Sequence, residues 1–290
     1  MLSGVGIVPK GSSSYHSAAV IFSTHGVTGL NQQTQSTSIT TTSRKRGVYL
    51  LPNLLTTGCM ASGFLAIISA INGDFGHAGA AIFLAMLFDG LDGRVARWTK
   101  TESLFGKEYD SVADMVSFGV APALVAYQWG VVRIAEYSGA WERFGWIAAF
   151  FYCVCTGLRL ARFNARPPSS DKRYFEGLPS PSAAGLVSAF VWFSSEWREP
   201  ALGGLVLTFS LTVICGLLMV SSFPYPSFKQ LGWDLRVKFF YFIIVPIIWA
   251  FIATNPASTL LFLFSTFALS APILWLSRKL RRLMGRPSSD

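Results

Sequence analysis

The stretch DGLDGRVARWTKTESLFGKEYDSVAD, residues 89–114, places acidic residues between two long apolar runs. Its four aspartates are Asp89, Asp92, Asp110 and Asp114. Ionisable groups are costly in or beside the hydrocarbon of a membrane, and where they occur they usually serve a function. If one helix runs through residue 97 and the next begins near Gly106, both aspartate pairs follow helical spacing. Each pair then lies on one face of its helix.

The composition predicts a membrane protein. Of the 290 residues, 51% are hydrophobic and only 13% are charged, whereas a soluble domain carries about 25% charged residues. Apolar runs of about 20 residues can cross a bilayer as helices. We therefore expect an all-α, polytopic membrane helix bundle with about eight spans, at 49–71, 76–99, 110–131, 145–164, 181–198, 202–222, 236–254 and 257–277.

The basic residues predict the orientation of these spans. The N-terminal tail, the segments 92–110, 159–181 and 229–238, and the C-terminus hold 21 of the 24 Lys and Arg residues. By the positive-inside rule, both termini and the aspartate stretch face the cytoplasm of a cell or inner membrane. The net charge of +9 then reflects loops that face anionic lipid headgroups, and no nucleic-acid partner is expected.

The two aspartate faces can meet, because the connection 98–105 is short and neighbouring antiparallel helices are joined in this way. Two like charges 4 Å apart repel by about 4 kcal/mol at an effective dielectric near 20. Oxygen ligands without His or Cys indicate Mg²⁺, Mn²⁺ or Ca²⁺, and four carboxylates can hold two such ions for displacement at phosphorus. Glycines beside them allow close approach of a ligand, and Arg97 can hold a phosphate oxygen.

A simpler alternative is a solvated helix hairpin whose acids pair with Arg94, Arg97, Lys100 and Lys107. The shared face with small residues, directly after an apolar run, favours the functional interpretation. The four cysteines lie in apolar runs without a C-x-x-C pair or a nearby His cluster. They therefore predict neither a disulfide framework nor a zinc site.

The same residues carry a family resemblance. The pattern D-x2-D-G-x2-A-R-x8-G-x3-D-x3-D is that of the CDP-alcohol phosphatidyltransferases. The chain matches it at every fixed position: Asp89, Asp92, Gly93, Ala96, Arg97, Gly106, Asp110 and Asp114. The resemblance implies a six-helix membrane core with its active site at the cytoplasmic edge. There an alcohol displaces CMP from a CDP-linked lipid, and family members often pair as homodimers.

The resemblance also implies a role for each residue and a layout for the chain. The aspartates would be metal ligands, with Asp114 also the general base, and Asp92, Gly93, Ala96, Arg97 and Gly106 would line the CDP-lipid. Asn53 would either contact the cytosine or cap the first helix. The expected layout is a disordered tail (1–43), the family core (44–222), two further transmembrane helices (223–278) and a basic cytoplasmic tail (279–290).

Three further stretches resemble the phosphatidylserine synthase branch of the family: LPNLLTTGCMASGFLAI, DSVADMVSFGVAPA, and LRLARFN followed by FEGLPSPSAAG. The resemblance implies phosphatidyl transfer from CDP-diacylglycerol to L-serine. A carboxylate-bearing acceptor needs a cation, for which Arg159 and Arg162 are candidates, with Ser117 nearby. Arginines at a helix end also commonly reach lipid headgroups. The Pro-rich segment could equally be a substrate-covering loop or the entry to the next helix.

Two alternative functions remain open at this point. One is a sibling transferase that uses glycerol 3-phosphate, inositol phosphate or a CDP-aminoalcohol, for which a phosphorylated acceptor would call for more cations. The other is a transporter or cation channel with an acidic vestibule. Transporter sites tend to lie at the membrane midplane on broken helices, whereas these acids lie at one basic edge.

Overall fold

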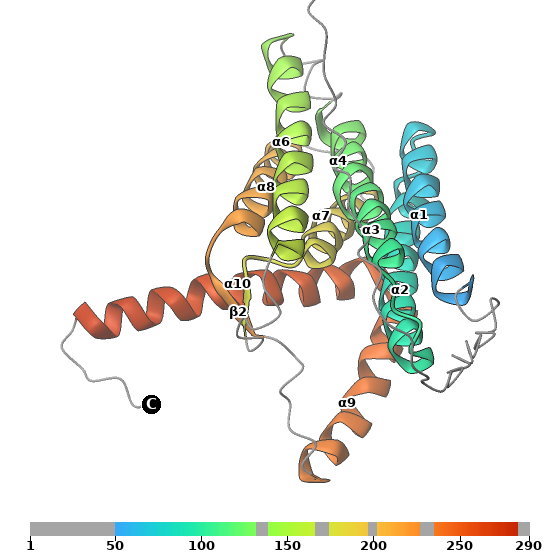
Figure 1. Ribbon diagram of the computed structural model, residues 1–290. Helices are drawn as coiled ribbons and strands as arrows, with labels where there is room; N and C mark the ends of the chain where they lie inside the picture. The colour runs from blue at the N-terminus through green and yellow to red at the C-terminus, as the bar shows by residue number, and fades with distance from the viewer. Residues whose placement is uncertain (1–49, 132–138, 166–173, 197–201, 227–234, 284–290) are drawn as a thin grey trace, which may run out of the picture. The chain divides into compact units, whose positions relative to one another are not determined.

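The computed structural model describes residues 50–131, 139–165, 174–196, 202–226 and 235–283. The expected tail 1–43 and the end of the basic tail lie outside them. The described elements are almost all helical (Figure 1). They are α1 (Leu50–Ile71), α2 (Phe75–Thr99), α3 (Leu104–Asp114), η2 (Met115–Val120), α4 (Ala121–Ala126), η3 (Tyr127–Val131), α6 (Gly139–Asn164), β1 (Tyr174–Glu176), α7 (Ser180–Ser195), α8 (Leu202–Val220), β2 (Pro224–Pro226), α9 (Leu235–Thr254) and α10 (Pro256–Leu283).

The third expected helix begins earlier than the apolar pattern predicts. It starts at Leu104 rather than residue 110, because the hydroxyl of Ser103 caps it by accepting a 2.9 Å hydrogen bond from the N–H of Gly106. From there the chain stays helical to Val131, through two π-helical segments, η2 and η3. Proline lacks an N–H and so cannot make an ordinary helical hydrogen bond, and Pro122 is the second residue of α4, which follows the first of these segments.

Small residues let α1 and α2 pack closely along their length, and the two helices run side by side in Figure 1. The buried contact is made by Cys59, Ala66 and Ala70 of α1 with Ala78, Ala81, Ile82 and Ala85 of α2. Interfaces of this kind are typical of membrane helices, where short side chains allow the backbones to approach. At Gly63 of α1, an added Cβ would lie 2.7 Å from the Cα of Ser117, so α1 also packs tightly against η2.

The other half of the bundle is built on α6. This helix packs against α8, and the hydroxyl of Tyr152 donates a 3.1 Å hydrogen bond to the carbonyl of Phe118 in η2. The short strands β1 and β2 pair antiparallel, with Phe175 opposite Tyr225. Tyr225 is fully buried and its hydroxyl donates to the carbonyl of Ala268 in α10 at 2.9 Å. The strand pair therefore joins the ends of α6 and α8 to α10, which also packs against α7.

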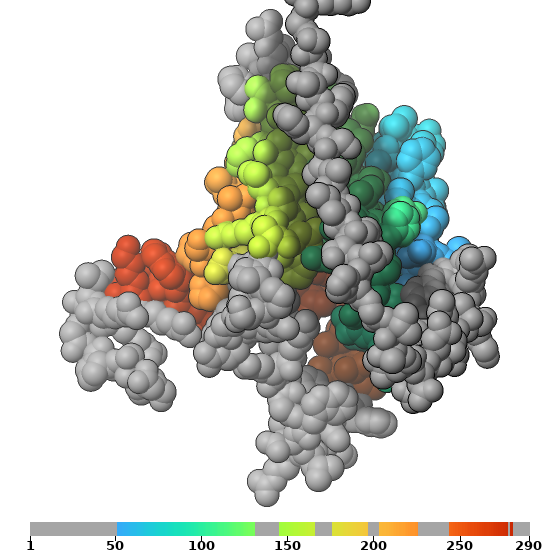
Figure 2. All heavy atoms as spheres, in the orientation of Figure 1, coloured from blue at the N-terminus to red at the C-terminus, as the bar shows by residue number. Residues whose placement is uncertain are grey.

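Four helical stretches in the described part of the chain are long and apolar enough to cross a membrane: Leu51–Ile71, Gly145–Asn164, Gly203–Val220 and Pro256–Ser277. Their outer side chains are apolar and open, as on α1 (blue in Figure 2), where Leu54 is 63% and Phe64 60% exposed. The other expected spans include α2 and α3, which carry the aspartates, and α9, whose apolar stretch is described only over Ile244–Thr254. The protein is an all-α integral membrane protein.

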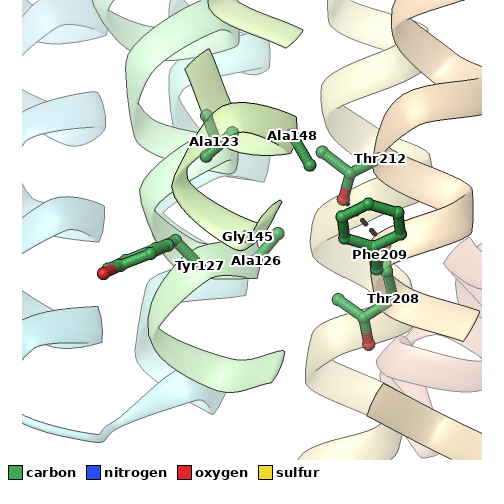
Figure 3. A pocket seen from close by; sticks show the side chains of 9 residues that line it. Ala123, Ala126, Tyr127, Gly145, Ala148, Thr208, Phe209 and Thr212 are labelled. Atoms are coloured by element: carbon green, nitrogen blue, oxygen red, sulfur yellow. Dashed lines mark hydrogen bonds between the residues drawn. The ribbon is translucent and has the colours of Figure 1, made fainter. Parts of the chain in front are cut away.

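A small cavity of about 10 Å³ lies between η3, α4, α6 and α8. Figure 3 shows its lining, which includes Ala126, Gly145 and Thr212; the Thr212 hydroxyl donates to the Thr208 carbonyl at 2.8 Å. Its volume is that of about one water molecule. Gly145 lies about 20 Å along α6 from Arg159, by the rise of an α-helix. The cavity is therefore remote from the residues that the sequence analysis singled out.

Candidate active site

The two aspartate pairs meet as the helical spacing predicts. Asp89 and Asp92 lie near the end of α2, and Asp110 lies near the middle of α3. One carboxylate oxygen from each of these three residues lies within 4.8 Å of those of the other two. Because the spacing puts the pairs on single helical faces, the short connection after α2 is enough to bring the faces together.

Asp114 completes the cluster at the last residue of α3. Its carboxyl lies close enough to Asp89 and Asp110 for the charges to interact. Its Oδ1 is buried and has no hydrogen-bond partner within the described residues. A buried carboxylate oxygen without a partner is unfavourable, and four neighbouring carboxylates repel one another. A bound cation would pair with the buried oxygen and would reduce the repulsion between the carboxylates.

The donor set fits a hard divalent cation. Carboxylate oxygens are the ligands that Mg²⁺, Mn²⁺ and Ca²⁺ prefer, and the group of Asp89, Asp92 and Asp110 offers three of them at one place. The Asp114 oxygen that has no hydrogen-bond partner among the described residues could supply a fourth donor from the same two helices. The cluster could therefore hold a metal ion.

Helix α1 supplies contacts to the cluster that the sequence reasoning missed. The hydroxyl of Thr56 donates a 2.7 Å hydrogen bond to Oδ2 of Asp92. On the next residue, the hydroxyl of Thr57 lies 2.9 Å from that of Tyr109, the neighbour of Asp110. The sequence signal that could have identified Thr56 was its position three residues after Asn53, because this spacing places both residues on one face of a helix.

Asn53 lies within α1, so it is not the residue that caps the helix. Its Oδ1 faces α3, 3.5 Å from where a Cβ on Gly106 would lie. Gly106 itself forms the capped first turn of α3. The asparagine is therefore beside the aspartate helix, where the resemblance implies a nucleotide, and its contact with cytosine stays a prediction.

The glycine after Asp92 keeps one face of α2 open. A Cβ on Gly93 would meet nothing closer than the Nη1 of Arg97 at 3.8 Å, among the described residues. Ala96 on the same helix is partly exposed and Arg97 is exposed. Small side chains flanked by a guanidinium leave room for a phosphate-bearing ligand, because the arginine can hydrogen-bond its oxygens.

The three candidate serine-binding residues have different surroundings. Arg159 of α6 is partly buried, donates a 2.6 Å hydrogen bond to Ser180, and lies close enough to Asp89 and Asp114 to interact with their charges. Arg162 instead lies 3.2 Å from Glu176. Of the two arginines in the described residues, Arg159 is thus the one whose charge acts on the aspartate cluster.

Ser117 lies one turn after Asp114 but is fully buried. Its hydroxyl donates to the carbonyl of Cys59 at 3.0 Å and lies 3.5 Å from the thiol of the same residue. These contacts join η2 to α1. A role for Ser117 or Arg162 in binding serine stays a prediction.

Comparison with known proteins identifies relatives across most of the chain. The family described as CDP-alcohol phosphatidyltransferase matches residues 49–221. A Helicobacter pylori protein named CDP-diacylglycerol–serine O-phosphatidyltransferase is 35% identical over 229 residues, 79% of this chain and 92% of its own length. A Mycobacterium tuberculosis protein of the same name is 37% identical over 191 residues, 62% and 63% of the two chains.

An archaeal protein is similar to the same degree. The archaetidylserine synthase of Methanothermobacter thermautotrophicus is 34% identical over 184 residues, which cover 63% of this chain and 72% of its own length. The family match includes the whole aspartate stretch and ends near the end of α8, so α9 and α10 lie outside it.

Proposed function

This chain belongs to the CDP-alcohol phosphatidyltransferase family, and on that basis we propose that it transfers the phosphatidyl group of CDP-diacylglycerol to the hydroxyl of L-serine. The products are phosphatidylserine and CMP, as in phospholipid biosynthesis. The names of the bacterial and archaeal relatives support serine as the acceptor. Membership of this family replaces the transporter or channel alternative.

The observation that carries the proposal is the carboxylate cluster at one end of α2 and α3. Oxygens of Asp89, Asp92 and Asp110 converge within 4.8 Å, and Asp114 adds a buried oxygen without a partner in the described residues. We assign these four residues as ligands of a divalent cation, Mg²⁺ or Mn²⁺, with room in the ligand set for two ions. When bound, the metal offsets negative charge on the phosphates and on the departing CMP.

The CDP-lipid lies along α2 in this proposal. Gly93 and Ala96 give its phosphates access to the helix, and Arg97 donates hydrogen bonds to a phosphate oxygen. Gly106 and Asn53 face each other across α3 and α1, and they line the nucleotide end. Asp92, which accepts a hydrogen bond from Thr56, would help to hold the metal beside this binding surface.

Asp114 is the general base. Its carboxylate takes the proton of the serine hydroxyl, because an unactivated hydroxyl is a weak nucleophile. The serine oxygen then forms a bond to the phosphorus that carries diacylglycerol, and the bond from that phosphorus to the CMP oxygen breaks. General-base assistance is typically worth about 10²–10⁴ in rate. The carboxylate of serine binds near Arg159, whose charge acts on the same end of the cluster.

The reaction takes place at the cytoplasmic side of the membrane in this proposal. The distribution of Lys and Arg, 21 of 24 on the predicted cytoplasmic side, supports the orientation. Both substrates are then accessible, since CDP-diacylglycerol lies in the bilayer and serine in the cytoplasm.

The test is release of CMP from CDP-diacylglycerol by the purified protein in detergent. We expect release to require both Mn²⁺ or Mg²⁺ and L-serine, and phosphatidylserine to form in equal amount. Parallel reactions with glycerol 3-phosphate and with inositol phosphate test the sibling transferases. Faster release with either of these than with serine would overturn the assigned acceptor.

A further inference from the structure

Ser180 and Arg159 form a buried contact beside the aspartate cluster. Ser180, the first residue of α7, is fully buried, and its hydroxyl accepts a 2.6 Å hydrogen bond from Nη1 of Arg159. The charge of Arg159 acts on Asp89 and Asp114. The contact therefore fixes one nitrogen of a guanidinium whose charge acts on the proposed general base.

The backbone that leads to Ser180 is hydrogen-bonded to α8 and to the segment that follows it. The N–H of Gly177 donates to the carbonyl of Phe223 and the N–H of Leu178 to that of Leu218, each at 2.9 Å. Gly177 has a φ of +80°, and a Cβ there would collide with the carbonyl oxygen of Met219. Only glycine fits such a position easily. Ser180 is thus presented from a rigid segment.

The strand β1, which precedes Gly177, also contacts α6. Arg162, one turn after Arg159, lies 3.2 Å from Glu176 of β1 and donates to the carbonyl of Val220 at 3.3 Å. Both members of this ion pair are about half exposed, and exposed pairs contribute little stability. The contacts of Arg162 nevertheless hold the end of α6 next to β1. Arg159, one turn earlier on α6, is thereby held next to Ser180.

We propose that Ser180 is a positioning residue that orients Arg159 to receive the carboxylate of the acceptor, so that the pair makes the site selective for an amino acid. This inference rests on the proposed function. A guanidinium is planar and presents its donors in a fixed fork. Once one nitrogen donates a hydrogen bond to Ser180, the orientation of the guanidinium plane is fixed. A cation held in this way gives the acceptor carboxylate a charged hydrogen-bond partner in a site lined by four aspartates.

The test is the acceptor kinetics of Ser180→Ala in the purified full-length protein. Hydrogen bonds to charged groups contribute enough that their loss typically costs roughly tenfold or more. We expect KM for L-serine to rise by roughly that factor. The kcat and the KM for CDP-diacylglycerol should change little, because the aspartates and the α2 surface are untouched. Ser180→Thr keeps the hydroxyl and should restore the KM for serine.

Ser188→Ala is the matched control. Ser188 is equally buried on the same helix, and its hydroxyl has no hydrogen-bond partner among the described residues. Its replacement should leave the KM for serine unchanged. Ethanolamine, which is serine without the carboxylate, provides the second readout: Ser180→Ala should lower the preference for serine over ethanolamine, which loss of folding alone would not do.

Three outcomes would overturn the inference while the wild-type protein remains active on serine. They are an unchanged KM for serine in Ser180→Ala, an equal rise in both KM values, or an unchanged preference over ethanolamine. Additive effects of Ser180→Ala and Arg159→Lys on the KM for serine would also contradict it, since residues acting as a unit are non-additive. A wild-type protein that releases no CMP with serine would instead refute the proposed function, and the inference with it.

Discussion

The hydroxyl of Thr56 and Oδ2 of Asp92 are joined by a 2.7 Å hydrogen bond that links α1 to the aspartate cluster. Both side chains are buried, with about 4% of each exposed. The bond occupies one carboxylate oxygen of Asp92 and sets the direction of the other. Groups that orient a ligand in this way commonly affect metal affinity as much as activity. We therefore expect Thr56 to affect the metal affinity of the aspartate cluster without contacting the substrate.

Thr56→Val should weaken metal binding. Valine keeps the shape of threonine but cannot donate to Asp92, and loss of such an outer contact typically costs about 10- to 100-fold in metal affinity or activity. The measurement is CMP release as a function of Mn²⁺ concentration, which should show a higher half-saturating concentration. Thr56→Ser retains the hydroxyl and should titrate like the wild type. A normal metal titration in Thr56→Val would show that the bond is incidental.

Removal of divalent metal should abolish turnover. The reason is the convergence of Asp89, Asp92 and Asp110, whose mutual repulsion a cation relieves. Protein stripped with EDTA should release no CMP in excess chelator, and activity should return when Mn²⁺ or Mg²⁺ is added beyond the chelator. Full turnover in excess EDTA would contradict the assignment of the cluster as a metal site.

The family and the all-α membrane fold were predictable because they depend on local patterns. Long apolar runs predict helices, and three- and four-residue spacing predicts which aspartates share a face. The relatives confirm the family assignment. The approach of Asp92 and Asp110 was also predictable, since a short connection joins neighbouring helices.

Contacts between distant segments were not predictable from such patterns. The Thr56–Asp92 bond spans 36 residues, and the pairing of Arg162 with Glu176 depends on a short strand outside any helix. The start of α3 at Leu104 lies before the predicted span 110–131, because Lys107 and Glu108 interrupt the apolar run and a cap from Ser103 marks the first turn. Similarly, no sequence pattern distinguished Arg159 from Arg162, which differ only in what the fold places opposite them.

Acidification should weaken the start of α2. Asp74 caps this helix: the backbone N–H of His77 donates to its Oδ1 at 3.1 Å and, together with the His77 side chain, lowers the pKa of the carboxyl. A lowered pKa in the folded state means that the contribution to stability is present above the unfolded pKa, about 3.9. It is lost as the pH falls through the lower, folded value.

The measurement is the thermal unfolding temperature in detergent as a function of pH. The wild type should exceed Asp74→Ala near neutral pH, and the difference should shrink below about pH 4. Asparagine caps helices without titrating, so the advantage of Asp74→Asn over Asp74→Ala should not change with pH. A wild-type advantage that is constant across this range would exclude ionised Asp74 as the stabilising form of the cap.

Pro256 and Arg286 should lie on opposite sides of the membrane. Residues Pro256–Ser277 form an apolar stretch long enough to cross it, and the basic residues after it favour the cytoplasm. Single cysteines introduced at the two positions, in a protein whose four native cysteines are replaced, can be labelled with an impermeant thiol reagent in sealed vesicles. Labelling of both positions from the same side would overturn the predicted topology but not the proposed chemistry.

Asp114→Asn and Asp89→Asn should separate the general base from a metal ligand. An amide at position 114 keeps the shape and can offer one oxygen to a metal, but it cannot take the serine proton. Turnover should therefore fall by at least about 10²-fold with a smaller effect on CDP-lipid affinity. Asp89→Asn removes a carboxylate from the convergent group and should weaken metal binding, lipid binding and catalysis together.

The two variants are compared by CDP-lipid affinity and by the single-turnover rate, because the first reports the metal-organised binding site and the second the proton transfer. Asp114 lies at the end of α3 with a buried oxygen that has no partner in the described residues, so its replacement removes no hydrogen bond from that atom. A binding defect equal to that of Asp89→Asn would leave Asp114 with the role of a metal ligand only and would contradict its assignment as the base. Near-normal turnover in Asp114→Asn would exclude it as the base, because no amide can accept the proton of a hydroxyl at neutral pH.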